Sequence, residues 1–406
     1  MKKLKITLIL LFCLIFCHPG RIFSQEKKND ICSTPNIKWQ IETGAPVYGS
    51  IVYEKDLLYA GNQSGKLFAI EPDKGDVQWT YQTEGAINCT PVVKEGVLYF
   101  ASMDGHVYAL SAQNGSLNWK FSTGGEKQKD IWDYTLSSPV LKGDTLFYGS
   151  SDGNLYALDR HTGKKLWQFS TDGMIHTTPV IKGKQIFFGN FNGYFFALNM
   201  ETMNLNWKFN TIGQQYFPKG AVQQGAAIAG ETLFFGSRDF NIYALNAQTG
   251  TGVWNMYEQG SWVISTPVIK DTLLLFGTSD SYHFYALDLR NGRKKWRTDV
   301  DLNILSKATA GDKLVYVGSL AGKLYAMNLS DGSIEWTFQT QQSKENWHHV
   351  FNKNNEIRKD IYKINDMDIH KVYDQIHNLG SIISQPTLNE GVLYLGSMDG
   401  MIYAIE

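Results

Sequence analysis

The sequence predicts an all-β protein, an eight-bladed β-propeller built from four-stranded antiparallel blades. One observation is a motif that recurs about every forty residues, in which an aromatic-Ala-aliphatic triplet is followed by Trp eleven positions after the aromatic. A second is an eighth triplet, Tyr403-Ala404-Ile405, that has no Trp after it, while Trp39 has no triplet before it. The third is the frequency of turn residues between short alternating runs, which favours strands. Together they predict a ring whose last blade is completed by the strand carrying Trp39.

Residues 1–24 have the pattern of a secretory signal peptide. Three lysines precede an apolar run from Ile6 to Cys17, and a small residue, Ser24, ends the segment. The run is too short to span a bilayer, and no later run is long and apolar enough to do so. We therefore expect an exported chain without a membrane span. Lipidation at Cys17 stays an alternative, although Phe16 stands where a lipid-attachment signal has a small residue.

Charge and cysteine content exclude several classes of function. The formal net charge is −1, and removal of residues 1–24 takes away four basic residues and no acidic one. A nucleic-acid or anionic-membrane binder needs a basic patch, which this balance does not indicate. Cys32 and Cys89 lie beyond the signal, and two cysteines do not make a disulfide framework. We expect both thiols to be unpaired.

The chain is expected to enter the ring after a polar, flexible lead-in over residues 25–35. The propeller then spans residues 36–406, and its first strand, around Trp39, belongs to the last blade. Blade two illustrates the pattern, with four short apolar runs between residues 90 and 121. Asp104-Gly105 and Asn114-Gly115 separate the later runs, and such pairs form tight hairpin turns because they tolerate positive φ.

Eight tryptophans are expected to dock each blade onto the next. A Trp on an outer strand must bury a large ring and satisfy one N–H donor, while the Ala of the triplet leaves room beside it. A Gly in the following turn allows close approach of the backbone, and Met203 replaces this Gly in blade four. The docking residues are Trp39, Trp79, Trp119, Trp167, Trp207, Trp254, Trp296 and Trp336.

This repeat resembles the tryptophan-docking repeat of the PQQ-type (quinoprotein-type) propellers. The match is best at Ala157, Asp159, Gly163 and Trp167, and it extends over the chain beyond the signal. The resemblance implies an eight-bladed propeller, a scaffold that hosts many activities. As a whole, the chain resembles the BamB family of outer-membrane assembly factors, which consist almost entirely of such repeats. That likeness implies a periplasmic scaffold that helps to deliver and fold outer-membrane proteins.

Three insertions break the period, and all three occur between an outer strand and the next inner strand. They follow Trp119, Trp207 and Trp336 and add eight, seven and thirty-eight residues. Since such connections emerge on one face of a propeller, that face is expected to carry the function. Aromatic residues in these loops suggest a recognition surface, and folding back to cap the axial funnel is the alternative. The candidate surface residues are Trp132, Tyr134, Tyr216, Phe217 and Trp347.

The third insertion, residues 341–378, is expected to contain two short amphipathic helices. Ile357, Ile361 and Ile364 share one helical spacing, and a second set starts at Ile369, capped by Asn365 or Asp366. We expect the apolar faces to pack on the propeller top, with a partner protein as the alternative.

Candidates for chemistry are few. His370, Asp374 and His377 share a helical face, but the spacing lacks a zinc-binding His pair and favours a solvated surface. The PQQ-dependent dehydrogenases, which this repeat resembles, carry adjacent cysteines and acidic calcium ligands, and this chain has no Cys-Cys pair. No Gly-x-Ser-x-Gly elbow or P-loop is present. Polar residues expected at the rim of the funnel are Asn88, His176, Gln223, Gln224 and Trp262.

These observations favour a non-catalytic, exported, monomeric scaffold that binds envelope proteins on its decorated face. No catalytic residue, cofactor or metal site is expected, and no nucleic acid is expected as a partner. Two alternatives remain: a sensor or carrier with a small ligand in the funnel, and a quinone-binding propeller similar to PQQ-dependent dehydrogenases.

Overall fold

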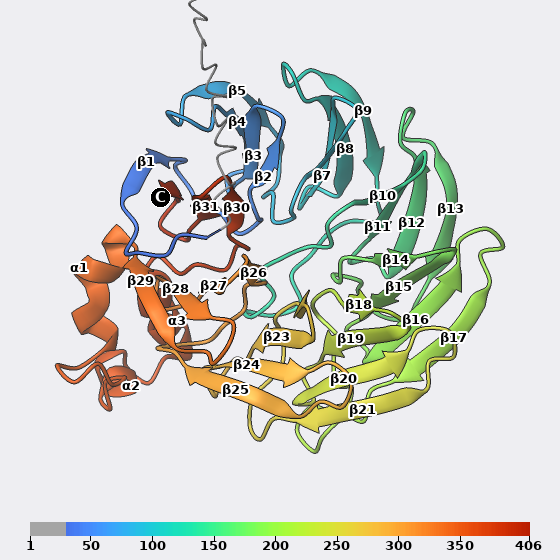
Figure 1. Ribbon diagram of the computed structural model, residues 1–406. Helices are drawn as coiled ribbons and strands as arrows, with labels where there is room; N and C mark the ends of the chain where they lie inside the picture. The colour runs from blue at the N-terminus through green and yellow to red at the C-terminus, as the bar shows by residue number, and fades with distance from the viewer. Residues whose placement is uncertain (1–29) are drawn as a thin grey trace, which may run out of the picture.

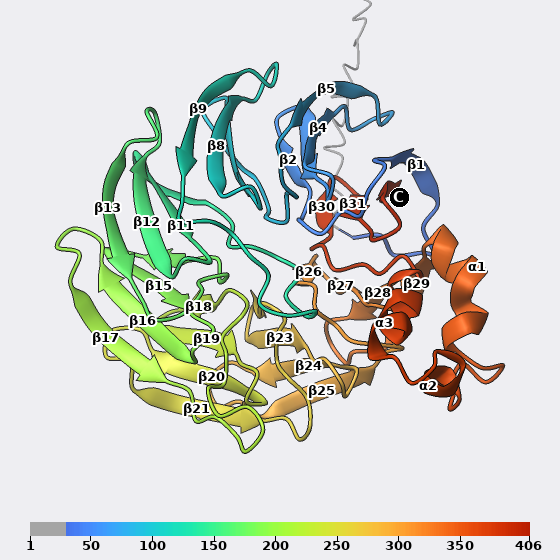
Figure 2. The same cartoon turned by 180° about the vertical axis from the view of Figure 1, so that it is seen from behind.

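The computed structural model describes residues 30–406 and shows a ring of eight four-stranded antiparallel sheets (Figure 1), which confirms the predicted propeller. The expected signal peptide and residues 25–29 of the expected lead-in lie outside the described residues. Seen from behind, the first blade and the last blade lie next to each other, so the ring closes between them (Figure 2). The blades surround a central axis, and function therefore depends on what covers that axis.

Each blade contributes one strand to each of four concentric positions. The innermost strands are β2 (Val52–Glu54), β6 (Val92–Lys94), β10 (Val140–Lys142), β14 (Val180–Lys182), β18 (Ala227–Ala229), β22 (Val268–Lys270), β26 (Thr309–Ala310) and β30 (Thr387–Asn389). The second strands are β3 (Leu57–Gly61), β7 (Val97–Ser102), β11 (Thr145–Gly149), β15 (Gln185–Gly189), β19 (Thr232–Gly236), β23 (Leu273–Gly277), β27 (Leu314–Gly318) and β31 (Val392–Gly396).

The third and outermost strands carry the repeat motif. The third strands are β4 (Lys66–Ile70), β8 (His106–Ser111), β12 (Asn154–Asp159), β16 (Tyr194–Asn199), β20 (Asn241–Asn246), β24 (His283–Asp288), β28 (Lys323–Asn328) and β32 (Met401–Ile405). The outermost strands are β5 (Val77–Gln82), β9 (Leu117–Ser122), β13 (Lys165–Ser170), β17 (Leu205–Asn210), β21 (Gly252–Tyr257), β25 (Lys294–Asp299), β29 (Ile334–Gln339) and β1 (Ile37–Glu42). The second and third strands are buried almost throughout because neighbouring blades cover both of their faces.

The last blade has the order β1-β32-β31-β30, so its outermost strand comes from the start of the propeller. Trp39 lies opposite Ala404, and Ile41 lies opposite Ile402. The same Ala–Trp pairing occurs within the other blades, as Ala109 with Trp119 in blade two. The predicted closure by the strand carrying Trp39 is therefore confirmed.

The docking tryptophans also bond across the blade junctions. The indole Nε1 of Trp119 donates to the carbonyl of Arg160 in the next blade over 3.0 Å. A Cβ on Gly163 would lie 2.6 Å from this indole, and its φ of +70° is left-handed, so only glycine fits the turn without strain. Seven of the eight indoles make such a bond to a backbone carbonyl.

The exception is the junction between blades three and four. Met203 stands at the glycine position of blade four and keeps a left-handed φ of 60°. Among the described residues, the facing indole of Trp167 has no hydrogen-bond acceptor, and its ring is only partly buried. The side chain at position 203 therefore coincides with the docking indole that makes no such bond within residues 30–406.

Asp30 and Ile31 correct the expectation of a flexible lead-in. Ile31 is only 6% exposed, and its N–H donates to the phenol oxygen of Tyr316 over 2.8 Å. The carboxylate of Asp30 accepts the backbone N–H of Lys313 over 2.7 Å. The polar composition of residues 25–35 did not reveal these contacts because they depend on blade seven, nearly three hundred positions later in the sequence.

The third insertion contains three helices rather than the two predicted: α1 (Gln341–Val350), α2 (Ile361–Ile364) and α3 (Ile369–His377). Thr340 caps α1, and Asp368, rather than Asn365 or Asp366, caps α3. Ile357 is not helical but forms an isolated bridge with Phe351. Within residues 30–406, every helix is too short or too polar to cross a membrane.

Candidate functional site

The three insertions meet over the axis of the ring. Trp132 from the first insertion lies edge-on to Tyr373 of α3, with ring centroids 4.4 Å apart, and edge-on to Trp262 at 6.3 Å. Phe217 from the second insertion packs edge-on against Trp262 at 5.0 Å. These four residues, called the aromatic cap below, join loops that follow blades two, four, five and seven.

Hydrogen bonds link the loops that carry the aromatic cap. The phenol oxygen of Tyr134 lies 2.8 Å from Nε2 of His377, which ties the first insertion to α3. Burial lowers the pKa of His377, partly opposed by the nearby charge of Asp374, and burial also raises the pKa of Tyr134. Gln223 donates from Nε2 to the carbonyl of Trp132 over 2.7 Å, which ties the second insertion to the first.

Arg238, in the hairpin between β19 and β20, braces the cap from below. It donates from Nε to the Oε1 of Gln223 over 2.9 Å and from Nη2 to Asp130 over 3.1 Å. Its guanidinium lies 4.6 Å from the ring centroid of Trp262, within cation–π distance. Burial alone would raise the pKa of Asp130, but the hydrogen bond and charge of Arg238 outweigh it and lower that pKa.

The candidate surface aromatics lie in different environments. Tyr134 is only 5% exposed, so it cannot contribute to a recognition surface, which corrects the prediction for this residue. Trp132, Phe217 and Trp347 are half-buried, and Trp347 stacks on Phe351. Tyr216 is 78% exposed. The alternative in which the loops fold back over the funnel describes Trp132, Tyr134 and Phe217.

The third insertion contains packed and exposed apolar residues. Ile361, Val372 and Ile376 are buried in a cluster that also contains residues of the propeller top, as expected. Ile364 and Ile369 were expected to pack there as well, but both are exposed, which corrects that prediction. Tyr362 and Met367, in the same stretch of eight residues, are also exposed, Met367 to 74%. These four residues are called the α2–α3 patch. The sequence does not distinguish them from the packed residues, because the spacing of apolar residues is irregular in short helices and turns.

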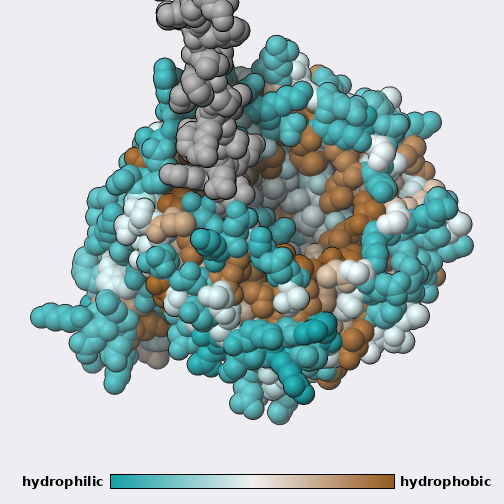
Figure 3. Space-filling model, in the orientation of Figure 1, coloured by the Kyte–Doolittle hydropathy of each residue, from teal (hydrophilic) through white to brown (hydrophobic). Residues whose placement is uncertain are grey.

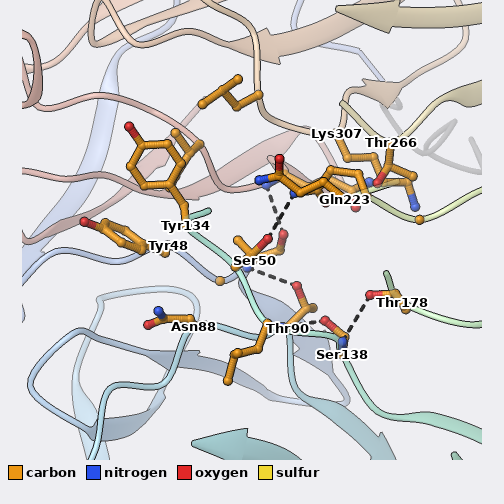
Figure 4. A pocket seen from close by; sticks show the side chains of 18 of the residues that line it. Tyr48, Ser50, Asn88, Thr90, Tyr134, Ser138, Thr178, Gln223, Thr266 and Lys307 are labelled. Atoms are coloured by element: carbon orange, nitrogen blue, oxygen red, sulfur yellow. Dashed lines mark hydrogen bonds between the residues drawn. The ribbon is translucent and has the colours of Figure 1, made fainter. Parts of the chain in front are cut away.

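Beneath the cap lies an axial cavity of about 340 Å³. The face drawn in Figure 3 is hollowed near the centre of the ring, with apolar residues around the hollow. Tyr48 and Tyr134 lie together on one side of the cavity, and hydroxyl side chains line its wall (Figure 4). Of the predicted rim residues, Asn88, Gln223 and Gln224 line the cavity.

The other two predicted rim residues point elsewhere. Trp262 belongs to the aromatic cap, and His176 belongs to a buried polar cluster. Nδ1 of His176 lies 3.0 Å from Asp133, and its Nε2 lies 2.7 Å from Oγ of Ser151. Ser, His and Asp in this order suggest a hydrolase triad, but all three side chains are buried, and Ser151 also contacts the carboxylate of Glu126 at 2.8 Å. The cluster holds the first insertion in place, and because its side chains are buried, a substrate cannot reach them.

Metal and quinone chemistry find little support in the side chains present. Among residues 30–406, no three His, Cys, Asp or Glu side chains are grouped so that they could hold a metal ion. The residues that line the axial cavity include no carboxylate and no cysteine, so calcium beside a quinone would find no acidic ligand there. This donor set does not fit a calcium-assisted quinone, and the two described cysteines, Cys32 and Cys89, are not bonded to each other.

Comparisons with known proteins agree with this architecture. The family profile of "Outer membrane protein assembly factor BamB" matches residues 33–254 and 207–355. No curated protein sequence matches the chain. Among solved structures, BamB from Moraxella catarrhalis is similar with a TM-score of 0.67 and 17% identity, over 92% of this chain and 98% of that chain.

Two further structures have comparable similarity. The computationally designed Ika8 protein has a TM-score of 0.67 and 12% identity, over 89% of this chain and 96% of that one. Quinohemoprotein alcohol dehydrogenase from Comamonas testosteroni has a TM-score of 0.65 and 11% identity, over 92% of this chain and 76% of that chain. At these identities the likeness shows the fold alone, and BamB, a designed protein and an alcohol dehydrogenase all occur among the similar folds.

Proposed function

This chain belongs to the family of the outer membrane protein assembly factor BamB, and on that premise we propose that it is a non-catalytic protein scaffold of the cell envelope. In this proposal it is exported to the periplasm, acts as a monomer and assists the assembly of outer-membrane proteins. Its partners are other envelope proteins, bound on the face that the three insertions cover.

The α2–α3 patch is the observation that carries this proposal. Tyr362, Ile364, Met367 and Ile369 lie within eight consecutive residues and are all exposed, on a module whose other apolar residues are packed into the propeller top. Large groups of exposed apolar side chains are rare on soluble monomers, and they often mark interaction sites. Tyr216, on the second insertion, adds an exposed aromatic on the same face, and aromatic side chains dominate binding energy at interfaces.

Site-specific photo-crosslinking in cells tests this surface directly. A photoreactive amino acid at Met367 or Tyr216 is expected to capture a defined set of envelope proteins that includes outer-membrane assembly components. The matched control is Lys55, an exposed residue in the hairpin between β2 and β3, at the end of the blade opposite the insertions. Equal capture from all three positions would contradict the proposal.

A functional assay separates binding from stability. Cells lacking the protein are expected to have less folded β-barrel protein in the outer membrane, and the wild-type chain restores it. A variant with Tyr362→Ser, Ile364→Ser, Met367→Ser and Ile369→Ser is expected to fold but not to restore it, because only exposed side chains change. Full restoration by this variant would remove the patch from the proposal.

The mass of the mature amino terminus tests the membrane attachment. An unmodified chain that begins after residue 24 supports a freely exported protein, and a lipidated chain that begins at Cys17 supports a tethered one.

A further inference from the structure

A ring of eight equivalent residues surrounds the axial cavity, and one half of it is closed by hydrogen bonds. Each member lies two residues before the innermost strand of its blade. The members are Ser50, Thr90, Ser138, Thr178, Gly225, Thr266, Lys307 and Gln385, called the axial ring below.

In the closed half, the backbone N–H of one blade donates to the hydroxyl of the next. Gln385 donates to Ser50 over 3.0 Å, Ser50 to Thr90 over 3.2 Å, Thr90 to Ser138 over 2.9 Å and Ser138 to Thr178 over 3.1 Å. Each hydroxyl oxygen therefore accepts one bond, and within the described chain none of these four donates its own proton to a protein acceptor.

The other half of the ring is open. Gly225 has no side chain, so the N–H of Thr178 has no hydroxyl to donate to at that position. The hydroxyl of Thr266 and the ammonium of Lys307 follow, and neither has a hydrogen-bond or ion-pair partner among residues 30–406. Thr266 and Lys307 lie beside each other in the cavity wall (Figure 4). The hydroxyl of Thr266 and the ammonium of Lys307, both without a partner among the described residues, therefore border the space that Gly225 leaves.

Lys307 is the only charged side chain among the residues that line the cavity. Its side chain is exposed, and the cavity walls around it remove part of its hydration and lower the pKa of its ammonium. Because the walls exclude part of the bulk water, an anion bound here would interact with the ammonium more strongly than at an open surface. The cavity therefore offers one positive charge, several hydroxyl donors and no competing carboxylate.

The rest of the lining limits the kind of anion. Leu136, Ile264, Leu305 and Ile383 contribute apolar walls, and Tyr48 and Tyr134 close one side. The volume lies at the lower end of the range of small-molecule sites. One ammonium matches one negative charge, which favours a carboxylate over a phosphate dianion.

We propose that the axial cavity binds a small organic monocarboxylate, with its carboxylate group between Lys307 and Thr266 and its apolar part against Leu305 and Ile383. This site lies inside the ring and is separate from the α2–α3 patch, so it does not depend on the scaffold function. The missing side chain at Gly225 provides the space for the carboxylate.

Titration of the purified chain with a series of monocarboxylates from acetate to octanoate, together with benzoate, tests this site by calorimetry. At least one of them is expected to bind saturably at one site, and the corresponding neutral amide is expected not to bind. Lys307→Met should weaken binding at least tenfold. The matched control is Lys344→Met on α1, where an exposed lysine away from the cavity should leave the affinity unchanged.

A second variant guards against a loss of binding caused by misfolding. Gly225→Ser restores the missing hydroxyl, and its Cβ would lie 3.3 Å from the carbonyl oxygen of Thr178 and 3.6 Å from Oγ1 of Thr266, a fit that needs only a small shift. It is expected to keep the thermal stability of the wild type and to weaken carboxylate binding. Absence of saturable binding across the series, or equal affinity of wild type and Lys307→Met, would overturn the proposal.

Discussion

The indole Nε1 of Trp336 donates a 2.6 Å hydrogen bond to the carbonyl oxygen of Ile31, which lies 305 residues earlier in the sequence. At other junctions the acceptor is the fourth residue after the aromatic of the triplet, as Ala112 after Tyr108. For blade eight, whose aromatic is Tyr403, the sequence ends at Glu406, and Ile31 supplies the carbonyl instead. The ring is therefore closed by two separate contacts, the strand β1 and this bond.

The second contact predicts a stabilising role for the segment before β1. Ile31→Ala should lower the free energy of unfolding by about 2 kcal/mol, because a buried aliphatic side chain is lost next to Trp336 and Tyr316. Denaturant unfolding measures the change. Cys32→Ala, at the adjacent exposed residue, serves as the control and should change the free energy by less than about 0.5 kcal/mol.

Met203→Gly should stabilise the protein by about 1 kcal/mol, because glycine adopts a left-handed φ without a Cβ penalty and gives the indole of Trp167 room to dock. Gly163→Ala at the equivalent turn should destabilise it by about 2 kcal/mol, since its Cβ would lie 2.6 Å from the ring of Trp119. Thermal and denaturant unfolding distinguish the two. A destabilised Met203→Gly variant would show that the methionine side chain contributes packing that outweighs the strain.

The contact between Tyr134 and His377 predicts that the cap loosens in acid. Because burial lowers the pKa of His377, the folded state takes up fewer protons than the unfolded state below the ordinary pKa of about 6.5. Stability should therefore fall as the pH decreases from about 6.5, and residues 341–378 should exchange amide hydrogens faster after correction for the intrinsic rate. His377→Gln should flatten this dependence, and His370→Gln, an exposed residue on the same helix, should not.

Buried tyrosines paired with carboxylates predict a loss of stability in alkali. The phenol of Tyr285 donates to Glu258 over 2.7 Å, and burial together with this hydrogen bond raises its pKa to about 12. Since the unfolded pKa is about 10, the stabilisation is complete below that pH and is lost as the pH rises from about 10 through about 12. Tyr285→Phe should reduce the slope of unfolding free energy against pH in this interval. An unchanged slope would indicate that the phenol ionises freely in the fold.

The repeat made the fold predictable, whereas the site depends on contacts that no local pattern records. The spacing of triplet and Trp determined the number of blades and the pairing of Trp39 with the last blade. The helix α1 escaped prediction because Gln341–Val350 is mostly polar, so no apolar period marks it. The sequence places His176 at the rim and does not reveal its buried cluster, because its partners Asp133 and Ser151 come from loops 43 and 25 positions away.

The aromatic cap and the axial ring can be predicted only in part from the sequence, because they also depend on contacts between distant loops. Aromatic residues in the insertions were identified, but their burial depends on Trp262 and Tyr373, which lie in other loops. Only a comparison of the eight equivalent positions of the axial ring singles out Lys307, because the other seven residues carry no charge.

The position of β1 in the last blade also constrains the order of folding during synthesis. The ribosome makes β1 before every other strand of the ring and its partner β32 after them, so the eighth sheet cannot form until residues 401–405 have been synthesised. Until then β1 is an unpaired edge that waits for a strand more than 350 residues downstream, and such long-range pairing is slow. The nascent propeller therefore stays open, without a closed ring, until β32 has been synthesised.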